Sequence, residues 1–198
     1  MSDLAGSEGI HVTYGADLIL ALLYAGGEKR TENEEIRGNT RLDKLVFLLK
    51  QETTLKKYLN DFGFEPYNFG PYSSEVFDTV QALTNAKLVQ ITYESSEGYL
   101  DEADRYAVEV QLDDPDRSRF GVQSGAEQTA EPMLVYNLTP QGVEVAKALY
   151  ESLPPEEREE LHSLKKRFNS IPLRKLIQYV YRQHPEYTTE SVIKDSIL

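Results

Sequence analysis

Cysteine is absent from this 198-residue sequence, which excludes disulfides, thiolate metal sites and a cysteine nucleophile. Long apolar runs are absent too. The longest candidate, residues 16–25, already contains Asp17 and falls short of the roughly 18 residues that a membrane span needs. Met1-Ser2-Asp3-Leu4 lacks a basic region followed by an apolar run, so no secretory signal is expected. These absences favour a cytoplasmic protein without a membrane partner.

Positive charge is scarce and unevenly placed. Lys and Arg number 21 against 33 Asp and Glu, which gives a net charge of −12. Residues 94–131 hold eleven acidic side chains and three arginines, whereas residues 164–184 hold six basic side chains and no acidic one. Phosphate binding needs clustered Lys and Arg, so the second segment is the better candidate for an anionic partner. The same segment can instead pair with the acidic stretch of this or a second molecule.

Apolar periodicity predicts the first two helices. Residues 16–25 are almost uniformly apolar and stop at Gly26-Gly27, which is typical of a short buried helix. A second helix is expected from Thr40, which resembles a capping box with Asp43. Lys44 lies outside the core-facing stripe of this helix. That stripe consists of Leu42, Leu45, Val46, Leu48 and Leu49.

A third helix is expected after Ser73 or Ser74, with Asn85 as its left-handed stop. Its inward stripe consists of Val76, Phe77, Val80 and Leu83. Further helices are expected over residues 139–150, 154–168 and 173–182, and a short one after Thr188 or Thr189.

Two runs, residues 87–93 and 133–138, have the β-branched and aromatic content of strands. Three helices, a strand, a long excursion, a strand and a helix follow the order of a winged helix.

The expected fold is therefore mainly α with a small antiparallel β-hairpin. Residues 1–150 would form a winged helix-turn-helix domain with a long acidic insertion at about 94–132, in which Val108 and Val110 allow one more strand. Residues 151–198 would form a C-terminal helical extension, basic at 164–184. The alternative is a four-helix bundle with a long loop.

Two motifs carry a resemblance to a known family. Arg41-Leu42-Asp43-Lys44-Leu45-Val46-Phe47-Leu48-Leu49 and Phe69-Gly70-Pro71-Tyr72-Ser73-Ser74-Glu75-Val76-Phe77 resemble the Panacea domain of SocA-like antitoxins and phage-associated proteins. Tyr136-Asn137-Leu138-Thr139-Pro140-Gln141-Gly142 looks like the exit of bacterial winged-helix regulators. The resemblance covers roughly residues 36–92 and 133–150. It implies a bacterial or archaeal regulator, antitoxin or adaptor without catalytic residues.

No catalytic, cofactor or metal site is expected. His11, His162 and His184 are widely separated, and no pair has the i, i+4 spacing of a zinc helix. Ser124, between Gly121 and Gly125, does not form a nucleophile elbow, and phosphate-binding glycine loops are missing. We expect neither an enzyme nor a small-molecule substrate.

The first hypothesis is a DNA-binding transcriptional regulator, with homodimer formation as an option. The third helix would present Tyr72, Ser73, Ser74 and Gln81 to the bases, although Glu75 and Asp78 would lie close to phosphate. The basic segment would hold phosphates through Lys165, Lys166, Arg167, Arg174, Lys175 and Arg182.

The second hypothesis is a Panacea-like antitoxin or adaptor that binds a partner protein, either a toxin or a regulatory target, without DNA. It would use the third helix and the aromatic loop at residues 62–72. The aromatic side chains of this loop either cover the core or form an exposed docking patch. They are Phe62, Phe64, Tyr67, Phe69 and Tyr72.

Overall fold

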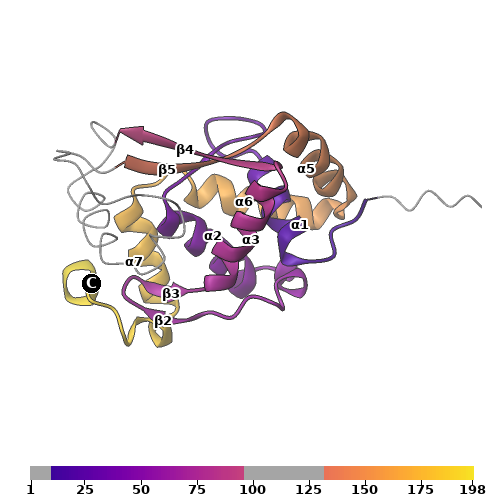
Figure 1. Cartoon of the computed structure of the whole chain (residues 1–198). Helices are drawn as coiled ribbons and strands as arrows, with labels where there is room; N and C mark the ends of the chain where they lie inside the picture. The colour runs from indigo at the N-terminus through magenta and orange to yellow at the C-terminus, as the bar shows by residue number, and fades with distance from the viewer. Residues whose placement is uncertain (1–9, 96–131) are drawn as a thin grey trace, which may run out of the picture.

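The computed structural model describes residues 10–95 and 132–198 (Figure 1). This part of the chain is mainly helical with small antiparallel sheets, as expected. The helices are α1 (Gly15–Tyr24), α2 (Asn39–Glu52), α3 (Ser74–Asn85), α5 (Pro140–Ser152), α6 (Pro155–Phe168), α7 (Leu173–Gln183) and α8 (Lys194–Ile197), with 3-10 turns η1 (Thr54–Tyr58) and η4 (Pro185–Thr188). The strands are β1 (Ile36–Arg37), β2 (Glu65–Tyr67), β3 (Gly70–Tyr72), β4 (Val89–Ser95) and β5 (Pro132–Leu138). The strand expected at residues 108–110 lies outside the described residues.

The two predicted strand runs pair as expected. β4 and β5 are antiparallel over their full length, from Val89 opposite Leu138 to Ser95 opposite Pro132. A third strand, β1, pairs with the other side of β5, so the sheet order is β1-β5-β4. β1 was not expected, because its two residues lie in a charged connector and are too few to show a strand periodicity.

Helix α2 runs through the middle of the molecule (Figure 1). It is buried at nearly every position from Thr40 to Leu49, because α6, α7 and β3 all pack against it. The single-stripe prediction was therefore wrong for this helix, and Asp43 and Lys44 are buried with the apolar side chains. The helix begins at Asn39 after Gly38, so Thr40 lies inside the first turn and does not cap it.

The C-terminal helices complete the core. Side chains of α6 and α7 belong to the same hydrophobic cluster as α1, α2 and α3. The contributing residues include Leu161, Leu164, Phe168, Leu176, Ile177 and Val180. Residues 151–198 are therefore an integral layer of the fold and do not form a separate appendage.

The sequence predicted the start of α5 correctly, but it placed the left-handed residue after α3 at the wrong position. The Thr139 hydroxyl accepts a hydrogen bond from the Gly142 N–H at 3.0 Å, with Pro140 at the first helical position, as predicted. Gly142 is required by close packing, since a Cβ there would stand 1.8 Å from the Leu88 carbonyl oxygen. After α3 the left-handed residue is Lys87, with a φ of 60°, and not Asn85.

The aromatic loop forms a hairpin of β2 and β3, in which Glu65 lies opposite Tyr72 and Tyr67 opposite Gly70. Gly70 has a φ of 87°, and a Cβ there would meet the Tyr181 ring at 2.7 Å. The glycine therefore allows the tip of the hairpin to lie directly against α7.

Candidate functional site

The start of α3 does not present all of its predicted contacts to solvent. Ser73 is only 1% exposed, and its hydroxyl donates to the Glu75 carboxylate at 2.7 Å. Its N–H donates to Asp43 Oδ1 at 3.3 Å. The expectation that Ser73 faces DNA bases was therefore wrong, because both of its polar groups are used inside the fold.

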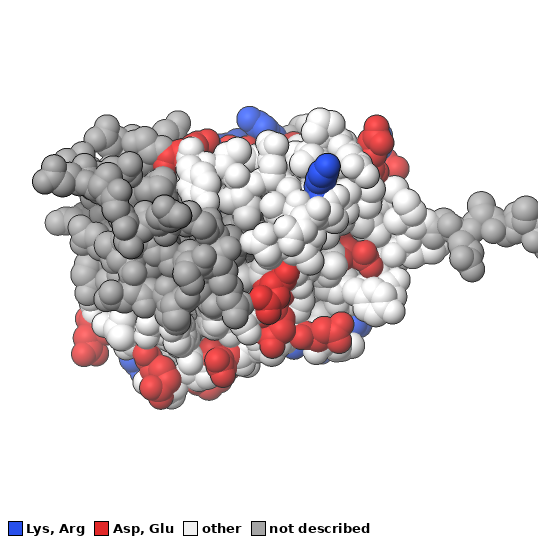
Figure 2. All heavy atoms as spheres, in the orientation of Figure 1, with Lys and Arg blue, Asp and Glu red and all other residues white. Residues whose placement is uncertain are grey.

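The exposed side of α3 is acidic. Glu75 and Asp78 are exposed, whereas Ser74 and Gln81 are half-buried. Gln81 donates to the Asn85 side chain at 3.3 Å. Figure 2 shows acidic side chains over the beginning of this helix and few basic ones on the same face.

Lys165 is fully buried, so its expected role in holding phosphate was wrong. Its ammonium group donates to the carbonyl oxygens of Leu22, Leu23, Ala25 and Glu34, at 2.6 to 3.1 Å. Burial lowers the pKa of Lys165 to about 7, and the charges of Glu34 and Glu35 oppose this shift. The side chain therefore fastens α6 to the end of α1 and to the segment before β1.

The other predicted basic residues do reach the surface of α6 and α7. Lys166, Lys175 and Arg182 are exposed. The Arg167 guanidinium lies 4.7 Å from the ring centroids of both Phe168 and Tyr179. Arg174 donates to the Ser196 carbonyl oxygen at 2.8 Å.

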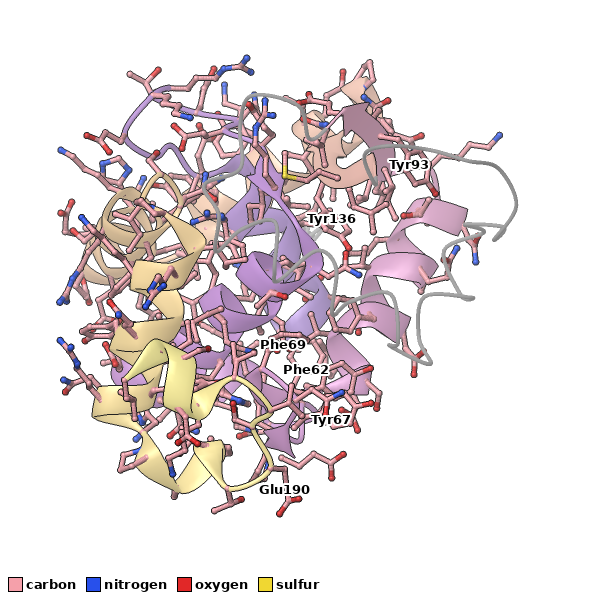
Figure 3. All side chains as sticks on the ribbon, turned by 90° about the vertical axis from the view of Figure 1, so that its left-hand side faces the viewer. Phe62, Tyr67, Phe69, Tyr93, Tyr136 and Glu190 are labelled. Atoms are coloured by element: carbon pink, nitrogen blue, oxygen red, sulfur yellow. The ribbon has the colours of Figure 1, made fainter. Side chains whose placement is uncertain are left out.

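The basic helices and α3 lie on opposite sides of α2 (Figure 3). α6 and α7 both pack directly on α2, which separates their exposed residues from those of α3. The structure therefore does not bring the predicted phosphate contacts together with the predicted base contacts.

A small pocket opens between the beginning of α2, the β2–β3 hairpin and the beginning of α3. Its volume is about 30 Å³, which is enough for one small chemical group. Its lining combines polar side chains of α2 with aromatic ones: Asn39, Thr40, Asp43, Lys44, Tyr67, Phe69, Gly70, Tyr72 and Phe77.

Three residues that line this pocket have donor hydrogens without an acceptor in the described part of the chain. Lys44, 2% exposed, donates to the Pro71 carbonyl oxygen at 2.5 Å and to Asp43 Oδ2 at 3.0 Å, which uses two of its three protons. The Tyr72 hydroxyl is buried without a partner in the described part of the chain. Asn39 accepts from the Tyr136 hydroxyl through Oδ1 at 2.5 Å, which leaves its NH₂ group to donate elsewhere.

A hydrogen bond from the buried Tyr136 fixes the orientation of the Asn39 amide. Tyr136 is fully buried, and desolvation raises its pKa well above the usual range, with the charges of Tyr93 and Asp43 adding to the shift. Its phenol therefore stays protonated and fixes the Asn39 amide with the oxygen turned toward Tyr136. The Asn39 NH₂ group is thereby held in one orientation.

Aromatic rings form the other wall of the pocket. The Tyr72 ring lies between Tyr67, at 5.0 Å, and Phe77, at 5.7 Å and nearly parallel. Phe62 and Phe69 are buried deeper in the core, and Tyr67 lies closer to the edge of the molecule (Figure 3). Phe62 and Phe69 thus cover the core, as one interpretation of the aromatic loop expected. Phe64, Tyr67 and Tyr72 are half-buried, so the docking patch stays a prediction.

Carboxylates lie on the hairpin and on α3, two of the elements that line the pocket. Glu65 is exposed and lies opposite Tyr72 in the hairpin. The Glu75 carboxylate lies beside Gly63, because a Cβ on that glycine would come 3.9 Å from its Oε1. We call Glu65, Tyr67, Tyr72, Glu75 and Asp78 the hairpin–α3 surface.

The sequence predicted only part of this site. It indicated Tyr72 and the aromatic loop, but Asn39 and Lys44 were missed. A signal for Lys44 existed, because Leu42 and Leu45 to Leu49 leave almost no polar side to the helix. A lysine in such a helix is expected to be buried and paired.

Within residues 10–95 and 132–198, no group of three or more His, Asp or Glu side chains is placed to hold a metal ion. No helix in the same ranges is long and apolar enough to cross a membrane. Comparison of the chain with family models, with curated proteins and with solved structures gave no match.

Proposed function

We propose that this chain is a non-catalytic binding protein of the winged-helix type that binds a partner protein through the hairpin–α3 surface. The order α1, β1, α2, α3, β4, β5, with β5 between β1 and β4, supports a winged-helix scaffold. The β2–β3 hairpin between α2 and α3 adds an aromatic side to that scaffold.

The observation that carries the proposal is the combination of exposed carboxylates with aromatic rings at the start of α3. Glu75 and Asp78 would repel DNA phosphate from the helix that reads bases in other winged-helix proteins. Tyrosine side chains such as Tyr67 and Tyr72 are favoured anchors in protein interfaces. The surface therefore suits a cationic protein partner better than a nucleic acid. A partner-binding role also agrees with the resemblance to the Panacea domain.

A DNA-binding regulator is the second candidate, favoured by the exposed Lys166, Lys175 and Arg182. Their helices, α6 and α7, lie on the side of α2 away from α3 (Figure 3). DNA would therefore contact the outer side of α6 and α7, and it would do so mainly through phosphates.

Site-specific photo-crosslinking in the native host tests the proposal. A photoreactive amino acid replaces Glu65, on the hairpin–α3 surface, and in a matched strain it replaces Lys147, an exposed residue of α5. We expect a discrete protein adduct at position 65 that is missing at position 147. The same adducts at both positions, or none at position 65, would overturn the proposal.

A further inference from the structure

We propose that the pocket beside Lys44 binds a neutral carbonyl oxygen supplied by an extended segment of the partner protein, either a main-chain carbonyl or a side-chain carboxamide. This inference rests on the proposed function, since it names what the hairpin–α3 surface recognises.

The donors of the pocket require an acceptor. Lys44, Asn39 and Tyr72 all line one small hollow. Among the described residues, the third Lys44 proton, the Asn39 NH₂ group and the Tyr72 hydroxyl have no acceptor. The Tyr72 hydroxyl is buried without a partner in the described part of the chain, and such a group is costly, so an oxygen placed beside it removes that cost. A carbonyl oxygen has two lone pairs and can accept from two of the donors at once.

The charges around the pocket favour a neutral acceptor. Asp43 lies within the lining and already balances the charge of Lys44, at 3.0 Å. The exposed Glu65 and Glu75 add negative charge on the hairpin and on α3, two of the elements that line the pocket. A carboxylate would be repelled by these groups, and a cation would meet donors inside the pocket. An uncharged carbonyl oxygen avoids both conflicts.

The size of the pocket indicates a segment of a larger molecule. About 30 Å³ accepts one small group but cannot bury a free metabolite. The rest of the ligand must therefore lie outside, against the hairpin–α3 surface with its Tyr67 ring and its carboxylates. A peptide with basic side chains beside its inserted carbonyl fits both features.

NMR titration of the isotope-labelled full chain with N-methylacetamide tests the inference. We expect saturable shifts in the backbone signals of residues 39–44 and 70–73, which acetate and methylammonium at equal concentration do not produce. Stronger shifts with either ion at these residues, or no saturable shift with the amide, would overturn the assignment.

A pair of variants links the binding to the pocket. Tyr72→Phe keeps the ring and removes the hydroxyl, so we expect N-methylacetamide to bind about 2- to 10-fold more weakly. Tyr14→Phe, at a residue that is 63% exposed, is the control and should leave the affinity unchanged. Equal affinity of Tyr72→Phe and the original chain would contradict the inference.

The titration needs no partner, so its failure is distinct from failure of the proposed function. An adduct at position 65 without amide binding would leave the protein-binding surface and remove only the role of the pocket.

Discussion

The Lys165 ammonium group lies 2.6 Å from the Glu34 carbonyl oxygen, although 131 positions separate the two residues. The same ammonium binds the last carbonyl groups of α1, including that of Leu22 at 2.8 Å. A cation at this end of a helix also interacts favourably with the helix dipole. One buried side chain thus joins α6, α1 and the segment that leads into the edge strand β1.

Replacing Lys165 with Met should destabilise the fold by about 3 kcal/mol, because several buried carbonyl groups lose their donor while the side-chain volume is nearly kept. Urea unfolding followed by circular dichroism measures the effect. Lys166→Met is the matched control at the next, exposed position and should change stability by less than about 0.5 kcal/mol. Equal effects of the two variants would show that the carbonyl contacts contribute nothing.

The stability of the protein should rise with pH between about 7 and 9. Burial lowers the pKa of Lys165 to about 7 in the folded chain, while in the unfolded chain it stays near 10.5. The unfolded state therefore binds more protons in this range, and the slope reaches about 1.4 kcal/mol per pH unit. Urea unfolding across this range should show the slope, and Lys165→Met should flatten it. A slope that survives in Lys165→Met would assign it to another group.

Gly142→Ala should destabilise the protein by about 2 kcal/mol, because the new methyl group would stand 1.8 Å from the Leu88 carbonyl oxygen and push α5 away from this backbone. Gly63→Ala is the control, since its methyl group would come only within 3.9 Å of its nearest neighbour, the Glu75 carboxylate. Thermal unfolding compares the two. A melting temperature of Gly142→Ala equal to that of Gly63→Ala would contradict the close packing of α5 on the Leu88 backbone.

Any binding of random duplex DNA at low salt should depend on basic residues of α7 and not on residues of α3. Reversing charge in Lys175→Glu with Arg182→Glu should weaken binding at least tenfold, as measured by fluorescence polarisation across a salt series. Neutralising Glu75 and Asp78 to Gln and Asn should change it less than twofold. An increase of tenfold or more in the second variant would place α3 against DNA and favour the regulator hypothesis.

Much of the fold follows from local patterns in the sequence. The stripe from Val76 to Leu83, the Thr139 cap and the two strand runs all depend on neighbouring residues, and the structure confirms them. Apolar spacing and capping chemistry act over a few positions, so the sequence displays them directly.

The polar interior could not be predicted in the same way. Lys165 and Lys44 are buried only because acceptors far away in the chain surround them, at Leu22 and Pro71 respectively. A charged side chain, taken alone, is expected at the surface. Lys165 was therefore wrongly predicted as a phosphate contact. The pocket depends on the same long-range contacts and on the β2–β3 register.

The central claim is that the hairpin–α3 surface binds a partner protein. Its most direct test uses the partner that cross-linking identifies, purified on its own, and measures by calorimetry how tightly it binds charge-reversed variants of this chain. Glu65→Lys with Glu75→Lys should weaken binding at least tenfold, while Lys175→Glu with Arg182→Glu should leave it within twofold. The reverse order of effects would place the partner on α6 and α7 and contradict the account.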